Sequence, residues 1–154
     1  MIIAGIDAST TCTGISYFKN GKLIDHEIID LKKNKNAELR IKEMFIGITT
    51  SISKHKPDVI YYEDNYQKIN PKTTKQLTLV MGATWGYCVQ NNIAIEPILP
   101  SEWRDTIGIN KPKADRKVYK QRAMDYVKNN FGLDVGDDEA DAICIGVAAN
   151  LLEN

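Results

Sequence analysis

Acidic residues stand at the ends of predicted elements at three widely separated points of the sequence. Asp7 follows the apolar run IIAGI, Glu63 ends the run DVIYYE, and Asp138 and Asp141 belong to the cluster DDEAD. Gathered carboxylates, without paired cysteines or several histidines, are ligands for a hard cation such as Mg²⁺, with Mn²⁺ as the alternative. Two ions about 3.5–4 Å apart would give the two-metal arrangement of nucleases and polymerases. The plainer alternative is that each acid is the first exposed residue of a loop.

The spacing of Asp138 and Asp141 favours a site over the plainer alternative. On a predicted helix, two residues three positions apart share one face, and Ile145, Ala148 and Leu152 continue that face. Acids in a first turn normally interact with the helix dipole and need only solvent. Here they lie on the apolar face, which is expected to face the core. A buried carboxylate is costly unless it is paired or binds a metal.

Histidine and cysteine offer no rival catalytic group. His26 and His55 have no nucleophilic Ser or Cys motif nearby, so we predict structural roles for both. Cys12, Cys88 and Cys144 stand far apart with no CxxC pair. This excludes a zinc ribbon and favours free thiols in a reducing cytosol.

The elements that would carry the acids begin with three strands, predicted at 2–6, 14–18 and 22–30. A polar turn follows the first of them, and Asn20-Gly21 is typical of a two-residue hairpin between the second and third. Short turns join strands that run antiparallel, so the chain is expected to open with an antiparallel unit.

From residue 36 onward the hydrophobic period changes to that of a helix. Ile41, Phe45, Ile48 and Ile52 follow one helix face, and Pro57 ends that helix. The elements predicted after it are a strand at 58–63, a helix at about 73–90, a strand at 93–98, a short helix from Ser101, and helices at about 115–131 and 137–152. The order predicts an α/β fold, with one domain over 1–154 that contains a mixed five-stranded sheet and helices on both faces.

The charge of the chain is balanced overall and uneven along it. Twenty Lys and Arg offset twenty Asp and Glu, yet residues 110–122 hold six bases against one acid, and Pro112 interrupts any helix there. We interpret this segment as a basic arm for phosphate binding; a solvated helix face is the alternative. No apolar run approaches 18 residues, and an acid at position 7 argues against a signal peptide. We therefore expect a cytoplasmic protein without a membrane span.

Three motifs together resemble one known family. GIDASTTCTG at 5–14, IYYED at 60–64 and DDEADAIC at 137–144 resemble the RuvC family of Holliday junction resolvases. That family belongs to the ribonuclease H and retroviral integrase superfamily. The resemblance covers essentially the whole chain, with the motifs in the right order. It implies that the mixed sheet is ribonuclease H-like.

The resemblance also implies site residues. The four metal-binding acids of the family match Asp7, Glu63, Asp138 and Asp141, with Asp137 as the rival for the third position. The first motif departs from the family, which often has proline and glycine directly after the first acid, where this chain has Ala-Ser.

DNA-contacting residues follow from the same resemblance. Tyr66 matches an aromatic residue that stacks into the junction centre, although it could be an ordinary loop tyrosine. The bases that contact the scissile phosphate are matched by Arg104 and Lys117, the latter with a catalytic role. Arg116 and Lys120 are the alternatives. The other predicted DNA-binding residues are Lys111 and Lys113.

The activity implied is that of a Mg²⁺-dependent crossover junction endodeoxyribonuclease, which acts in DNA recombination and repair. A homodimer would make paired symmetric nicks in a four-way DNA junction, leaving 5′-phosphate and 3′-hydroxyl ends. We predict the dimer face on the helix at 73–90 and no nucleotide cofactor. The Lys-, Asn- and Ile-rich composition indicates an AT-rich genome, which favours a bacteriophage source.

Three alternatives stay open. A ribonuclease H, or a flap or branched-DNA nuclease, would use the same acids on another substrate. GID-x-STT-x-TG also resembles the first phosphate loop of the actin and sugar-kinase superfamily, whose members bind ATP. A junction-binding protein without catalysis is the third.

Overall fold

The protein is described by a computed structural model of residues 1–64 and 70–154. Its sheet has five strands in the order β3-β2-β1-β4-β5. β1 pairs antiparallel with β2, and β2 with β3, whereas β4 pairs parallel with β1 and with β5. The strands are β1 (Ile2–Asp7), β2 (Cys12–Lys19), β3 (Lys22–Asp30), β4 (Val59–Glu63) and β5 (Ala94–Ile98). The predicted mixed sheet is therefore confirmed.

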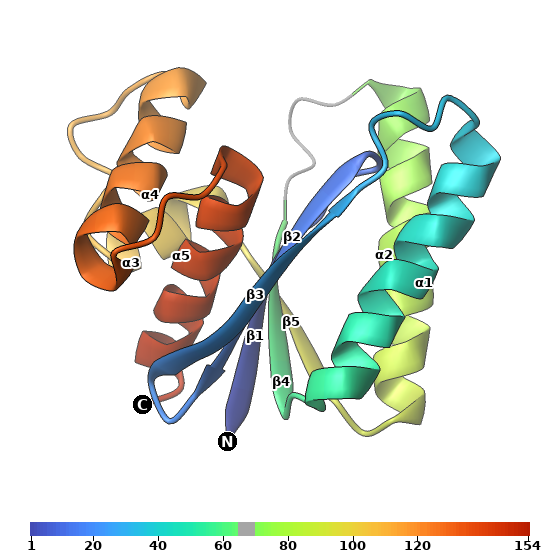
Figure 1. Cartoon of the computed structure of the whole chain (residues 1–154), viewed down its shortest axis with the longest axis horizontal. Helices are drawn as coiled ribbons and strands as arrows, with labels where there is room; N and C mark the ends of the chain where they lie inside the picture. The colour runs from blue at the N-terminus through green and yellow to red at the C-terminus, as the bar shows by residue number, and fades with distance from the viewer. Residues whose placement is uncertain (65–69) are drawn as a thin grey trace.

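Five described helices cover both faces of the sheet, as predicted. α1 and α2 lie on one face, while α3, α4 and α5 lie on the other (Figure 1). The helices are α1 (Ala37–His55), α2 (Pro71–Gln90), α3 (Pro100–Thr106), α4 (Arg116–Phe131) and α5 (Asp137–Leu152). No helix among the described residues is long and apolar enough to cross a membrane.

Local sequence signals explain where several elements begin and end. Asn20 and Gly21 both have positive φ, at 51° and 76°, as a type I′ hairpin turn requires. α1 ends at His55, before Pro57, as predicted. α2 begins two residues earlier than expected, because Asn70 caps it through its side chain and Pro71 fits the first helical position.

α5 lies closest to the sheet and is buried on almost every side, packed between β1, β2 and α4. Two glycines permit this approach, because a side chain on Gly5 would collide with the backbone of Gly146 and one on Gly14 with the carbonyl of Asp138. The predicted apolar stripe holds for Ile145 and Ala148. It is wrong for Leu152, which is exposed in the last turn of the helix, where Ala149 and Asn150 are the residues that stay buried.

Candidate metal centre and its basic surroundings

Three elements bring the predicted acids to one edge of the sheet. Asp7 ends β1 and Glu63 ends β4, and these strands are parallel neighbours, so their carboxyl ends meet. Because Gly14 lets the first turn of α5 touch β2, Asp138 and Asp141 reach the same edge. Asp141 is 8% exposed. The sheet order therefore joins residues that are more than 130 positions apart in sequence.

The electrostatics show that these acids act on one another. Burial, and then the charges of Glu63, Asp141 and Asp138, raise the pKa of Asp7 well above its usual range. Burial, followed by the charge of Glu63, raises the pKa of Asp141 to about 7. Carboxylates that raise each other's pKa share one low-dielectric space. A bound divalent cation would neutralise them, which is how such a donor set fits a hard metal ion.

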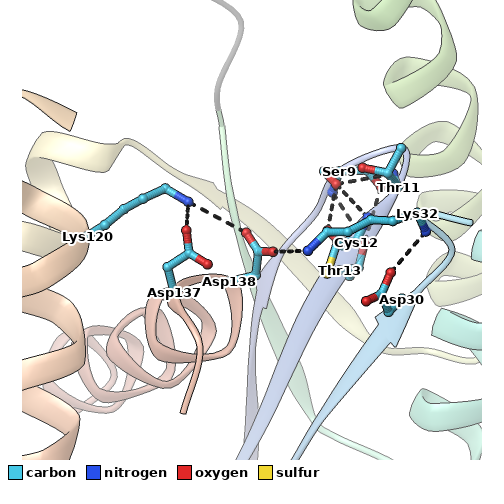
Figure 2. A network of polar contacts seen from close by, with 9 residues as sticks. All are labelled: Ser9, Thr11, Cys12, Thr13, Asp30, Lys32, Lys120, Asp137 and Asp138. Atoms are coloured by element: carbon cyan, nitrogen blue, oxygen red, sulfur yellow. Dashed lines mark hydrogen bonds and ion pairs between the residues drawn. The ribbon is translucent and has the colours of Figure 1, made fainter. Parts of the chain in front are cut away.

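In the described part of the chain, no three Asp, Glu, His or Cys side chains already form a closed set of metal ligands. Lysines occupy part of that space instead. Lys120 contacts Asp137 and lies 3.8 Å from Asp138, while Lys32 approaches Asp138 from the other side, also at 3.8 Å (Figure 2). The carboxylate oxygens are ligands that fit a metal ion. On binding the metal, Asp138 would give up its contacts with the two lysines.

The ion pair with Lys120 bears on the choice between Asp137 and Asp138. The Lys120 ammonium lowers the pKa of Asp137 below its usual range, as expected for a stable ion pair. Asp138, by contrast, is among the charges that raise the pKa of Asp7. The geometry therefore favours Asp138 over Asp137 as the third candidate ligand.

Glu63 is held by a residue that the sequence analysis missed. The indole Nε1–H of Trp103 donates to Glu63 Oε2 at 2.7 Å, and Trp103 is fully buried. Burial raises the pKa of Glu63, while this hydrogen bond and the charge of Arg104 lower it. A buried tryptophan usually finds an acceptor for its N–H. Trp103 stands directly before Arg104, but nothing in the sequence names Glu63 as that acceptor.

Three of the predicted bases approach the acids. The charges of Arg104, Arg116 and Lys120 all lower the pKa of Glu63. The guanidinium of Arg104 lies 4.4 Å from the ring centroid of Tyr119 and 4.9 Å from that of Trp103. It thus stands beside the carboxylates on an aromatic support.

The remaining predicted bases lie further out on the same side of the sheet. Lys111 and Lys113 are exposed in the segment between α3 and α4, and Lys117 is exposed on α4. Lys120, three residues after Lys117, contacts the acids of α5, because the α4 face that carries Lys120 is the one turned towards α5.

The turn after Asp7 is held by side-chain hydrogen bonds. The Ser9 hydroxyl donates to the Cys12 carbonyl at 2.6 Å and accepts from the Cys12 N–H at 2.8 Å, and the Thr13 hydroxyl donates to the Ser9 carbonyl. Burial and a hydrogen bond to Asp138 raise the pKa of Cys12 to about 12, so the thiol stays protonated. These groups serve to hold the turn that carries Asp7.

Comparison with known proteins identifies the family. The family model described as crossover junction endodeoxyribonuclease RuvC matches residues 3–149. The chain belongs to the RuvC family. A RuvC of Caldicellulosiruptor saccharolyticus is 28% identical over 155 residues, which cover 96% of this chain and 90% of that relative.

Solved structures of the RuvC family and of a viral resolvase share the fold. Thermus thermophilus RuvC in complex with Holliday junction substrate matches with a TM-score of 0.79 at 15% identity, covering 99% of this chain and 95% of that one. The fowlpox virus resolvase in complex with substrate Holliday junction DNA gives a TM-score of 0.64 at 16% identity, covering 97% of both chains. The fold is therefore the ribonuclease H-like fold of RuvC, as predicted.

The remaining predictions for this RuvC-family chain concern Tyr66, the two histidines and the three cysteines. Tyr66 lies outside the described residues. His26 Nδ1 lies 2.5 Å from Glu139 Oε1, and His55 Nε2 lies 2.7 Å from Asp25 Oδ2, so both histidines have structural partners, as expected. The three cysteines are free and buried.

Proposed function

We propose that this RuvC-family chain is a metal-dependent, structure-selective endodeoxyribonuclease that resolves four-way DNA junctions by paired symmetric nicks. The observation that carries the proposal is the group of carboxylates whose pKa values rise together at one sheet edge, with Arg104, Arg116 and Lys120 beside them. Family membership supplies the reaction class.

In this proposal Asp7, Glu63, Asp138 and Asp141 hold two Mg²⁺ ions, or Mn²⁺ ions in their place. When bound, the ions would supply Lewis acidity for attack of water on phosphorus. Burial raises the pKa of Asp7 and Asp141, so metal binding would displace protons from these carboxyl groups and the bound cation would then neutralise their charge.

The bases of this chain act on the phosphate rather than on the metal. Arg104, Arg116 and Lys120 would offset the negative charge that grows on the phosphate oxygens in the transition state. Lys111, Lys113 and Lys117 would contact phosphates further along the strand. This arrangement would leave 5′-phosphate and 3′-hydroxyl ends.

Two cuts in opposed strands require two sites, so we propose a homodimer of one nuclease domain per chain, spanning 1–154. The dimer face is the outer side of α2, where Leu79, Ala83, Gly86 and Val89 are exposed. A side chain on Gly86 would meet no atom within 4 Å, so another helix could approach closely there. Sedimentation should show a dimer that Ala83→Arg dissociates, while Thr50→Arg on exposed α1 should have no effect.

We place the enzyme in the cytoplasm, where DNA is accessible and buried cysteines stay reduced. A bacteriophage source stays a prediction.

A cleavage assay on a labelled synthetic four-way junction with Mg²⁺ tests the function. Linear duplex, a flap and an RNA–DNA hybrid serve as competing substrates. Asp7→Asn should abolish cleavage, whereas Asp125→Asn, an exposed acid on α4, should not. Paired nicks in the junction alone support the proposal. Cleavage of the hybrid or flap instead would overturn the substrate, and tight junction binding without cleavage would overturn the chemistry.

A further inference from the structure

A hollow of about 240 Å³ lies beside the carboxylates, between the end of β4 and the first half of α2. Its walls are mostly apolar and aromatic, and they include Tyr62, Leu77, Met81 and Trp85. Glu63 forms part of the same wall, so the hollow opens next to the proposed metal centre. Concave sites with apolar walls and a few polar groups are typical of ligand-binding sites.

We propose that this hollow binds an unstacked nucleobase of the DNA strand whose phosphate is attacked. The inference rests on the proposed function and deepens it, because it names a part of the substrate and the residues that receive it. The ligand class is a neutral planar heterocycle with hydrogen-bonding groups along its edge.

The aromatic side chains provide the first reason. Trp85 is 39% exposed, and its Nε1–H donates to the Tyr62 hydroxyl at 3.3 Å, which holds the two side chains together by their polar edges. Both side chains line the hollow, where Trp85 presents part of its ring, while Tyr62 also packs against the core. Bases extracted from a stack bind by stacking on aromatic side chains, which tolerate every base because each has a π-face.

The polar groups of the hollow provide the second reason. Asp64 and Thr78 belong to its lining. The Thr78 hydroxyl donates to the Thr74 carbonyl, so its oxygen can still accept a hydrogen bond. A carboxylate and a hydroxyl oxygen are acceptors suited to the exocyclic amino groups of bases. The negative charges of Asp64 and Glu63 disfavour a phosphate in the hollow itself.

The third reason is position. Ala8, which follows Asp7 directly, also lines the hollow together with Glu63. If the phosphate of a nucleotide lies at these acids, the base of that nucleotide or of its neighbour can therefore reach the hollow.

A second copy of the chain is the competing occupant, and the helix geometry separates the two. At about 100° per residue, Leu77, Met81 and Trp85 share one side of α2. Leu79, Ala83 and Gly86, on the proposed dimer face, point to another side, and Val89 lies between the two sides. A second copy that contacts α2 through Leu79, Ala83 and Gly86 therefore leaves Leu77, Met81 and Trp85 uncovered.

The test uses the wild-type protein first. Four-way junctions carry a single abasic nucleotide at each position around the nick in turn, and single-turnover cleavage is measured with Mg²⁺. One position should lower the rate by about 5- to 150-fold, the range expected for loss of one base–aromatic stack. Equal rates at all positions would overturn the proposal.

Variants then assign the effect to the hollow. Trp85→Ala should cut the intact junction as slowly as wild type cuts the junction that lacks the sensitive base. Removing that base should then not slow Trp85→Ala any further. Trp85→Phe should behave like wild type on both junctions. If Trp85→Ala slows both junctions by the same factor, or sediments as a monomer while wild type is a dimer, the hollow does not receive a base.

A binding readout keeps this inference separate from the proposed function. The Asp7→Asn variant is bound to a junction in which the fluorescent base 2-aminopurine replaces the base at the sensitive position. If wild type cuts no junction, 2-aminopurine is placed at each position in turn. If the fluorescence of 2-aminopurine is quenched at one position, and the added Trp85→Ala change removes that quenching, the result supports base binding in the hollow even without cleavage. Unchanged fluorescence at every position overturns the inference while leaving any observed cleavage intact.

Discussion

At the scale of single residues, the site depends on groups that act through other groups. Trp103 is the clearest case, because its N–H holds one carboxylate oxygen of Glu63 while the rest of the indole fills the core. Residues that orient a metal ligand commonly matter almost as much as the ligand. Sequence spacing identified the ligand candidate, but not the residue that orients it.

We predict that Trp103→Phe raises the Mg²⁺ concentration for half-maximal cleavage by about 10-fold or more. The ring remains, but Glu63 loses a hydrogen bond that lowers its pKa. Metal titration of the cleavage rate measures the effect. Tyr61→Phe, which loses a hydrogen bond to Glu153 far from the site, is the control. An unchanged titration for Trp103→Phe would show that Glu63 is oriented by other groups.

Stability without metal should depend on pH in a defined direction. Because Asp141 has its pKa raised from 3.8 to about 7, the folded state binds this proton more tightly than the unfolded chain does. Its favourable contribution is complete below pH 3.8 and is lost as pH rises through 7; Asp7 acts in the same direction.

The metal-free protein should therefore melt at a lower temperature at pH 8 than at pH 5.5, and Mg²⁺ should reverse the loss at pH 8. Asp141→Asn should reduce the difference. Thermal melts followed by circular dichroism measure this. A higher melting temperature at pH 8 without metal would contradict the shared site.

At the scale of elements, Tyr119 of α4 joins the parts of the basic surface. Its ring lies under Arg104 and 5.3 Å from the guanidinium of Arg122. Its hydroxyl donates to the Asn110 carbonyl at 3.1 Å. It thus ties α3, α4 and the segment with Lys111 together.

Two substitutions at Tyr119 should separate these contacts. Tyr119→Phe keeps the ring and loses the tie to Asn110, so we expect a higher KM for the junction with little change in kcat. Tyr119→Leu also removes the support of Arg104 and should lower kcat by about 10- to 100-fold. Steady-state kinetics on the junction distinguish the two. Equal kinetic effects of both variants would mean that the ring does not position Arg104.

The contact between β2 and α5 leads to another prediction at this scale. Gly14→Ala places a methyl group against the Asp138 carbonyl and should reduce the free energy of unfolding by about 1–3 kcal/mol. Cleavage should fall further than stability alone explains, because the turn that carries Asp138 must move. Urea unfolding and cleavage assays on the same variant measure the two effects. Full activity of Gly14→Ala would show that this turn has room to adjust.

At the scale of the whole molecule, charge is segregated although the net charge is zero. The basic segment and the acidic first turn of α5 lie on the same face of the sheet, which carries α3, α4 and α5 (Figure 1). Phosphate binding depends on this local density and not on the sum.

Junction affinity should consequently fall steeply with salt. We expect Lys111→Ala and Lys113→Ala each to reduce the slope of log affinity against log salt by about 0.9, with kcat unchanged. Lys42→Ala, on α1 across the sheet, is the control. Fluorescence anisotropy across a salt series measures the slopes. Slopes equal to that of the control would remove these lysines from the DNA interface.

By itself the sequence determined the element order, the three antiparallel strands, the helices on both faces and the four candidate acids. These features follow from local rules, namely hydrophobic period, hairpin residues and proline positions, which act within a few residues of the chain. The motifs also indicated the family, which the comparisons then confirmed.

Tertiary structure alone decided which groups meet. Glu63 pairs with Trp103, Asp137 with Lys120, and Arg104 with Tyr119, and each pair joins different elements. Such contacts depend on the rotation of each helix about its axis and on the glycines that set its distance from the sheet. A hydrophobic pattern limits that rotation only to a broad face, so it does not tell which of the α4 bases faces the acids of α5.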